Sequence, residues 1–156
     1  MLDTAQAIKH TEADVRSPER QVSSSPVVAI IEDDPNQRCM YGMFMDCLSP
    51  DTLHTEFVCG EDFILAVTQN GFRPTHVVCD YNMLELNGLE TLKQLIQFVK
   101  TVPGLEMPRL VLFTSRDLES SHIDRILGED RNLVIIKQKI VDGREYVRMA
   151  LGEEEP

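Results

Sequence analysis

Short strand-like segments alternate along this chain with segments whose apolar residues recur at helical spacing. Apolar runs of this kind predict strands buried on both faces of a parallel sheet, and the amphipathic segments predict helices that cover it. We expect strands at 27–31, 53–58, 76–79, 110–113 and 133–136, and helices at 35–48, 63–69, 89–100, 117–127 and 142–151. Five strand–helix units predict an α/β fold, a doubly wound three-layer sandwich.

Local signals support these helices. Asp34 suits the N-cap position of the first helix, and Pro35 suits its first helical position. The first helix is expected to bury a stripe at helical spacing: Met40, Met43, Phe44 and Cys47. The third helix is expected to bury one face formed by Leu92, Leu95, Ile96 and Val99.

The two ends of the chain differ in composition from the part between them. Residues 1–26 are polar and end in a serine-rich stretch before a proline, so we predict a flexible N-terminal arm. Residues 152–156 are predicted to be an acidic C-terminal tail. The folded domain is therefore expected at 27–151, which is long enough to form one hydrophobic core.

Composition excludes several classes of function. The 156 residues include 26 acidic and 15 basic ones, for a net charge of -11, which argues against binding to nucleic acid or to an anionic membrane surface. The longest apolar stretch has five residues, far fewer than a membrane span needs. The N-terminus has no apolar signal core and the four cysteines form no CxxC pair. We therefore expect a cytoplasmic protein without a disulfide framework.

Polar side chains follow the predicted strands at the points where they end. Glu32 and Asp33 follow the first strand, Asp80 the third, Thr114 the fourth and Lys137 the fifth. With sheet order 2-1-3-4-5, the first and third strands are neighbours at the topological switch point, where open α/β sheets bind ligands. Carboxylates gathered in a partly buried crevice are costly without a cation, so this set predicts a Mg²⁺ site.

The same set of groups suits phosphoryl transfer. A carboxylate can act as the nucleophile and become an aspartyl phosphate. Mg²⁺ needs one or two carboxylates together with water and phosphate oxygens, while a hydroxyl and a lysine can hold the remaining phosphoryl oxygens. Little further machinery is needed, because phosphoryl transfer depends mainly on positioning and charge neutralisation.

With these residues the sequence resembles the receiver domain of two-component response regulators, over residues 27–151. The resemblance rests on Ile30-Ile31-Glu32-Asp33-Asp34-Pro35, on Asp80-Tyr81-Asn82-Met83 followed by Gly88, on Thr114-Ser115 and on Lys137. It implies a stand-alone, CheY-like receiver with the flavodoxin-like fold and parallel sheet order 2-1-3-4-5.

The resemblance also implies a role for each matching residue. Asp80 would accept a phosphoryl group from a sensor histidine kinase or a histidine phosphotransfer protein, and Thr114 and Lys137 would contact that group. The protein ligands of Mg²⁺, for which Mn²⁺ can substitute, would be Asp33, Asp80, the backbone carbonyl of Asn82 and, through a water, Glu32.

Three positions depart from the family pattern. Gln138 stands where a proline commonly follows the lysine, Val134 stands where an aromatic switch residue is usual, and Leu84 replaces a frequent proline. The usual coupling of a threonine to an aromatic ring cannot operate here in its ordinary form. We expect output from the face of the fourth helix, fifth strand and fifth helix, with 116–121 as the mobile segment.

Two functions remain open at this point. The first is a single-domain response regulator, not a turnover enzyme, that is a monomer or weak dimer and binds a downstream protein when phosphorylated. The second is an atypical receiver that binds proteins without phosphorylation, which Val134 and Gln138 favour. A phosphatase of the haloacid dehalogenase type is disfavoured, because Glu32-Asp33-Asp34-Pro35 supplies either a glutamate nucleophile or a proline in the acid position.

Overall fold

The computed structural model describes residues 25–140 and 142–153, and these form a five-stranded parallel sheet. The strand order is β2-β1-β3-β4-β5. The strands are β1 (Val27–Ile31), β2 (Leu53–Phe57), β3 (His76–Asp80), β4 (Arg109–Thr114) and β5 (Val134–Gln138). The predicted doubly wound sandwich and its sheet order are thereby confirmed.

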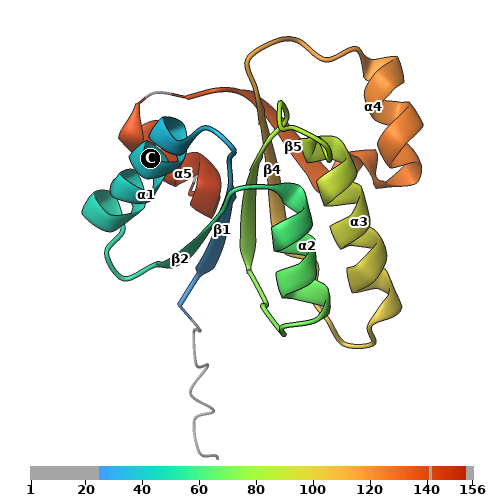
Figure 1. The fold of residues 1–156 in the computed structure, drawn as a ribbon, viewed down its shortest axis with the longest axis horizontal. Coiled ribbons are helices and arrows are strands. Elements are labelled where there is room, and N and C mark those ends of the chain that lie inside the picture. The colour runs from blue at the N-terminus through green and yellow to red at the C-terminus, as the bar shows by residue number, and fades with distance from the viewer. Residues whose placement is uncertain (1–24, 141, 154–156) are drawn as a thin grey trace, which may run out of the picture.

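Helices cover both faces of the sheet (Figure 1). One face carries α1 (Pro35–Leu48) and α5 (Gly143–Leu151). The other face carries α2 (Gly60–Thr68), α3 (Gly88–Thr101) and α4 (Ser120–Leu127). A short 3-10 helix, η1 (Gly128–Leu133), joins α4 to β5 and was not predicted. None of the helices in the described ranges combines the length and apolar character that crossing a membrane requires.

An apolar core lies on each side of the sheet because successive strand residues point to opposite faces. In β1, Ala29 and Ile31 belong to the core under α2, α3 and α4, whereas Val28 and Ile30 belong to the core under α1 and α5. Burial on both faces explains why the central strands are almost continuously apolar. The edge strand β2 differs, since three of its five residues are exposed.

The buried face of α1 differs from the predicted one. Its fully buried residues are Tyr41, Gly42 and Met45. Met43 is 59% exposed and Cys47 is exposed, while the other two predicted residues are half-buried. Tyr41 stacks on Tyr146 of α5 with ring centroids 4.3 Å apart, so packing between the helices sets the rotation of α1. By contrast, the face predicted for α3 is buried as expected.

Side-chain caps fix the helix starts next to the acidic strand ends. Asp34 accepts hydrogen bonds from two backbone N–H groups in the first turn of α1, as its predicted N-cap role requires. At α3, Asn87 and Glu90 form a reciprocal capping box. These caps hold the chain where it leaves β1 and where it enters α3, and so they restrict the loops that carry the candidate site.

The described fold has clear first and last elements. The first strand begins at Val27 and the last helix ends at Leu151. Nearly all of the predicted N-terminal arm, and most of the C-terminal tail, lie outside the described residues. The largest differences in element boundaries are at α4, which begins at Ser120 instead of 117, and at α2, which begins at Gly60 instead of 63.

Candidate functional site

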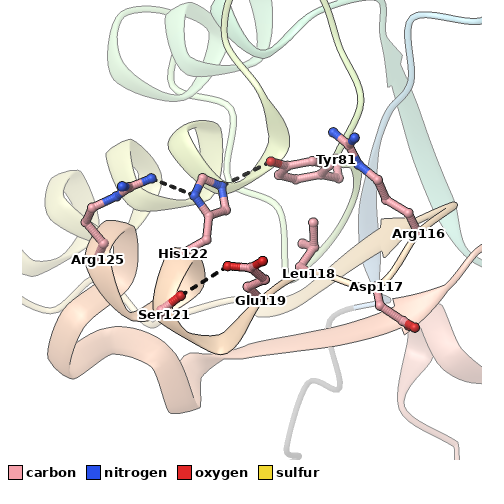
Figure 2. A pocket seen from close by; sticks show the side chains of 8 residues that line it. All are labelled: Tyr81, Arg116, Asp117, Leu118, Glu119, Ser121, His122 and Arg125. Carbon is pink, nitrogen blue, oxygen red and sulfur yellow. Dashed lines mark hydrogen bonds between the residues drawn. The ribbon is translucent and has the colours of Figure 1, made fainter.

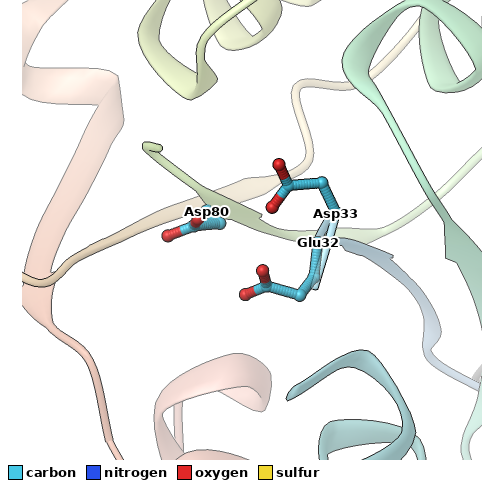
Figure 3. Close-up of side chains that lie close together, drawn as sticks. All are labelled: Glu32, Asp33 and Asp80. Atoms are coloured by element: carbon cyan, nitrogen blue, oxygen red, sulfur yellow. The ribbon is translucent and has the colours of Figure 1, made fainter. Parts of the chain in front are cut away.

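Three carboxylates meet at the carboxyl ends of two adjacent strands. Glu32 and Asp33 follow β1, Asp80 ends β3, and these strands are paired in the sheet. One carboxylate oxygen from each residue lies within 4.8 Å of the others. Figure 3 shows the three side chains gathered around one small space. The structure therefore brings together the three acids that the strand ends predicted.

Two of these carboxylates are almost completely buried. Glu32 is 1% and Asp80 is 3% exposed. Burial, helped by the charge of Asp80 and opposed by Lys139, raises the pKa of Glu32 to about 7. Burial also raises the pKa of Asp80, with Lys139 opposing and Asp33 adding to the shift. A site that disfavours its own negative charges in this way is one that a cation would stabilise.

The cation beside these carboxylates is Lys139, and the prediction that Lys137 reaches the site is wrong. The Lys139 ammonium lies 3.1 Å from Asp80 Oδ1 and 3.3 Å from Glu32 Oε2. It also donates a hydrogen bond of 2.7 Å to Gln37 Oε1. The side chain of Lys137 is exposed. The lysine that the structure places beside the carboxylates is therefore Lys139 and not Lys137.

The prediction failed because β5 continues beyond its last apolar residue. The strand includes Lys137 and Gln138, and as an edge strand it pairs with β4 on one side only. Lys139 then donates its backbone N–H to the carbonyl of Thr114, which places it at the end of β4. With the lysine at 139, the residue that follows it is Ile140 and the third residue before it is Ile136, so proline and the aromatic ring are still missing.

One oxygen of Asp80 has a single polar partner. Asp80 Oδ1 is buried, and among the described residues its only polar partner is the Lys139 ammonium, 3.1 Å away. Buried carboxylate oxygens are normally satisfied by protein or by a bound ion. A buried oxygen with a single partner, within a cluster of three carboxylates, is compatible with a hard divalent cation such as Mg²⁺, which prefers oxygen ligands.

Thr114 lies at the end of β4, next to the strand that carries Asp80. It is 2% exposed, and its hydroxyl donates to the backbone carbonyl of Arg116 at 2.7 Å. The same oxygen accepts from the backbone N–H of Arg116 at 3.2 Å. Thr114 therefore holds the beginning of the β4–α4 loop in this state.

Two loops meet over the site. Asn82 Nδ2 donates to Ser115 Oγ at 3.0 Å, and Arg116 Nη2 donates to Asn82 Oδ1 at 3.5 Å. Gly88 is the first residue of α3 and lies close to the end of β3. A Cβ atom added to Gly88 would lie 2.3 Å from the backbone oxygen of Asp80. Only glycine allows α3 to start so close to the end of β3, which gives a physical reason for the glycine in the sequence motif.

An open pocket of about 570 Å³ lies beside these loops (Figure 2). It is formed by Tyr81, by the β4–α4 loop and by the first turns of α4. The hydroxyl of Tyr81 is hydrogen-bonded to His122, which lies 41 residues later in the chain. Neither this contact nor the position of Lys139 was predictable from the sequence, because both depend on where α4 and β5 pack and not on a local motif.

Comparison with known proteins shows the fold but gives no close relative. No protein-family model matches the sequence, and no curated protein matches it either. The chemotaxis protein CheY4 of Vibrio cholerae is 13% identical, with a TM-score of 0.62 over 83% of this chain and 98% of that one. A CheY-like response regulator receiver domain from Methylobacillus flagellatus is 19% identical, with a TM-score of 0.62 over 84% of this chain and 100% of that one.

A third solved structure is the phosphorylated cyanobacterial phytochrome response regulator RcpA. It is 15% identical to this chain and has a TM-score of 0.60 over 83% of this chain and 91% of its own. At these low identities, the similarity establishes the fold of the chain but not its activity. The chain has the fold of CheY-like response regulator receiver domains.

Proposed function

We propose that this chain is a single-domain response regulator that receives a phosphoryl group on Asp80. The observation that carries the proposal is the position of Asp80, buried at the switch point of a receiver fold between two further carboxylates and the ammonium of Lys139. Ligands of open α/β sheets bind at this crevice. The donor would be a sensor histidine kinase or a histidine phosphotransfer protein.

The chemistry assigns a role to each group in the crevice. A carboxylate oxygen of Asp80 attacks phosphorus, the bond from phosphorus to the donor nitrogen breaks, and its electron pair returns to the imidazole of the donor. The Lys139 ammonium favours the ionised nucleophile and faces the charge of the arriving phosphoryl group. The hydroxyl of Thr114 can donate to a phosphoryl oxygen once it leaves the carbonyl of Arg116.

Mg²⁺ is the proposed cofactor, and Mn²⁺ is an alternative with similar ligand preferences. Asp33 and Asp80 would hold it directly, with the backbone carbonyl of Asn82, and Glu32 would act through a water. When bound, the ion neutralises charge on the phosphoryl oxygens. The grouping of the three carboxylates, with a buried Asp80 Oδ1 whose only described partner is the Lys139 ammonium, supports this assignment.

The proposed output is a change in binding to a downstream protein, without turnover of a substrate. We place this action in the cytoplasm and expect a monomer or a weak dimer. A second candidate, a receiver that binds proteins without phosphorylation, is favoured by one observation. Ile136 and Ile140 stand around Lys139 where the family has an aromatic residue and a proline.

The two candidates differ in their response to beryllofluoride, a mimic of the phosphoryl group. We expect Mg²⁺ and beryllofluoride together to shift the backbone NMR signals of Asp80 and Lys139 in the wild type, and to leave the Lys139 signal unchanged in Asp80→Asn. Asp46→Asn, which removes an exposed carboxylate on α1, is the matched control and should respond as the wild type does. A wild-type protein without any response at these signals would leave the binding module as the better account.

A further inference from the structure

A chain of side chains runs from the residue after Asp80 to helix α4 (Figure 2). The hydroxyl of Tyr81 and Nε2 of His122 lie 3.1 Å apart. On the other side of the imidazole ring, Arg125 Nη2 lies 2.9 Å from His122 Nδ1. His122 and Arg125 both belong to α4, so this chain joins the end of β3 to that helix.

The chemistry of the three groups fixes the direction of the hydrogen bonds. A guanidinium group can donate but cannot accept, so Nδ1 of His122 must be the acceptor from Arg125. The neutral imidazole then carries its hydrogen on Nε2 and donates it to the hydroxyl oxygen of Tyr81. The phenol of Tyr81 is therefore held to α4 through a specific tautomer of His122.

Thr114, on the β4 side of the candidate site, is also linked to the ring of Tyr81. The guanidinium of Arg116 lies over the ring of Tyr81, 5.6 Å from its centroid, as a cation–π contact. The backbone of Arg116 is tied to the hydroxyl of Thr114 by two hydrogen bonds. Asp80 is thus linked to the ring through the chain, and Thr114 is linked to it through Arg116.

Backbone hydrogen bonds restrict movement of the main chain at Tyr81. Its N–H donates to the carbonyl of Phe113 at 2.8 Å, and its carbonyl accepts from Met83 and Gly88 at 3.1 Å each. The start of α4 is held less firmly, because its N-cap residue, Glu119, makes no side-chain capping bond. A displacement at the site is therefore expected to move α4 more readily than the end of β3.

We propose that the Tyr81–His122 hydrogen bond, with Arg116 on the ring, couples phosphoryl occupancy of Asp80 to the position of α4. This inference rests on the proposed function and gives it a route of output. The hydroxyl of Thr114 has one hydrogen, so donating it to a phosphoryl oxygen ends its bond to the carbonyl of Arg116. One of the two hydrogen bonds that tie Arg116 to Thr114 is then lost, while the bond from the Arg116 N–H follows the Thr114 oxygen, and so Arg116 and the loop into α4 shift.

The proposed coupling would replace the one that an aromatic residue on β5 provides in the family, since this chain has no aromatic residue at that position. Ile136 occupies the third position before the site lysine and has no ring to turn. Tyr81 is 9% exposed and lies against the core beneath α4, so it is placed to act from the β3 side instead. The two discrete arrangements that a coupling requires are Thr114 bonded to Arg116 and Thr114 bonded to the phosphoryl group.

Tyr81→Phe tests the proposal, because it removes the hydroxyl and keeps the ring. Hydrogen exchange of the α4 amides is measured with and without Mg²⁺ and beryllofluoride, and the NMR shift at Lys139 reports occupancy of the site. We expect the variant to bind the mimic as the wild type does. Its response in α4 should fall roughly fivefold, the factor that corresponds to one ordinary hydrogen bond.

Two further comparisons separate coupling from a purely structural role. Tyr146→Phe is the matched control, because that buried hydroxyl has no partner in the described part of the chain, and it should keep the full α4 response. His122→Gln keeps an N–H donor and should retain part of the response, whereas His122→Leu should lose it.

The outcomes are distinguishable. An α4 response in Tyr81→Phe equal to that of the wild type would overturn the coupling. A wild type that binds the mimic at Lys139 without any change in α4 would overturn it as well, while leaving the proposed function intact. A wild type that shows no shift at Lys139 contradicts the proposed function and removes the coupling with it.

Discussion

Glu32 and Asp80 are nearly excluded from water, and a single described ammonium group, that of Lys139, faces both of them. Burial is the main reason that the pKa values of both carboxyl groups are raised, and the charge of Lys139 opposes the shift in each case. The acids were predictable because apolar runs end directly before them. The lysine was not, because two polar residues of an edge strand separate Lys139 from the last apolar residue of β5.

Replacing Lys139 should impair phosphorylation of Asp80, whereas replacing Lys137 should not. Lys139→Ala removes the charge 3.1 Å from the nucleophile, and we expect the rate of labelling by acetyl phosphate to fall about tenfold or more. Lys137→Ala removes an exposed lysine from the same strand region and is the matched control. Equal rates in the two variants would show that Lys139 does not act at the site.

Glu32 gives the metal-free protein a distinctive dependence of stability on pH. Its pKa rises from 4.5 to about 7 on folding, so between these values the folded state holds a proton that the unfolded state has lost. The free energy of unfolding should therefore fall as pH rises through this window, by up to about 3 kcal/mol from Glu32. Urea denaturation in chelator, at roughly pH 5 and pH 7.5, measures the effect.

The control for this prediction is Glu32→Gln, which cannot titrate. Its stability should fall less over the same window, with the remaining slope coming from Asp80, whose pKa is also raised. The assignment would be contradicted if wild type and variant had the same dependence on pH, or if the wild type became more stable as pH rose.

At the scale of elements, packing decided what local pattern could not. The helical spacing identified α1, but the stacking of Tyr41 on Tyr146 set which face it buries. The predicted cap residue Asp34 acts where the sequence places it, because capping is a local interaction. The turn η1 was missed, since its six residues carry no strong periodicity.

The close approach of α3 to β3 predicts the effect of changing Gly88. In Gly88→Ala the new Cβ would lie 2.3 Å from the backbone oxygen of Asp80 and 2.6 Å from Leu112 Cδ1. Because backbone must move, we expect a loss of about 1–3 kcal/mol in the free energy of unfolding, together with weaker binding of Mg²⁺ and beryllofluoride. Urea denaturation and a titration followed by NMR measure the two effects.

Gly42→Ala is the matched control for Gly88. Its Cβ would meet the carboxylate tip of Glu56, a partly exposed side chain that can turn away. Alanine also favours the interior of a helix over glycine by up to about 1 kcal/mol. We expect little change or a small gain in stability, and a loss as large as that of Gly88→Ala would refute the backbone argument.

For the whole molecule, the order of the elements was the strongest signal in the sequence. The alternation of strand and helix predicted the layers, and the right-handed connection of parallel strands leaves few ways to arrange them. That arrangement alone brings Asp33, Asp80 and Lys139 into one crevice, although they come from distant parts of the chain. The fold therefore determined where the candidate site lies, even though Lys137 was predicted at the site in place of Lys139.

The proposed function depends most directly on whether Asp80 becomes phosphorylated. The protein is incubated with acetyl phosphate and Mg²⁺, the acyl phosphate is trapped by reduction with borohydride, and the modified residue is located by peptide mass spectrometry. We predict modification at Asp80, which is lost when Mg²⁺ is chelated and absent in Asp80→Asn. Modification at other acids alone, or none at all in the wild type, would contradict the central claim.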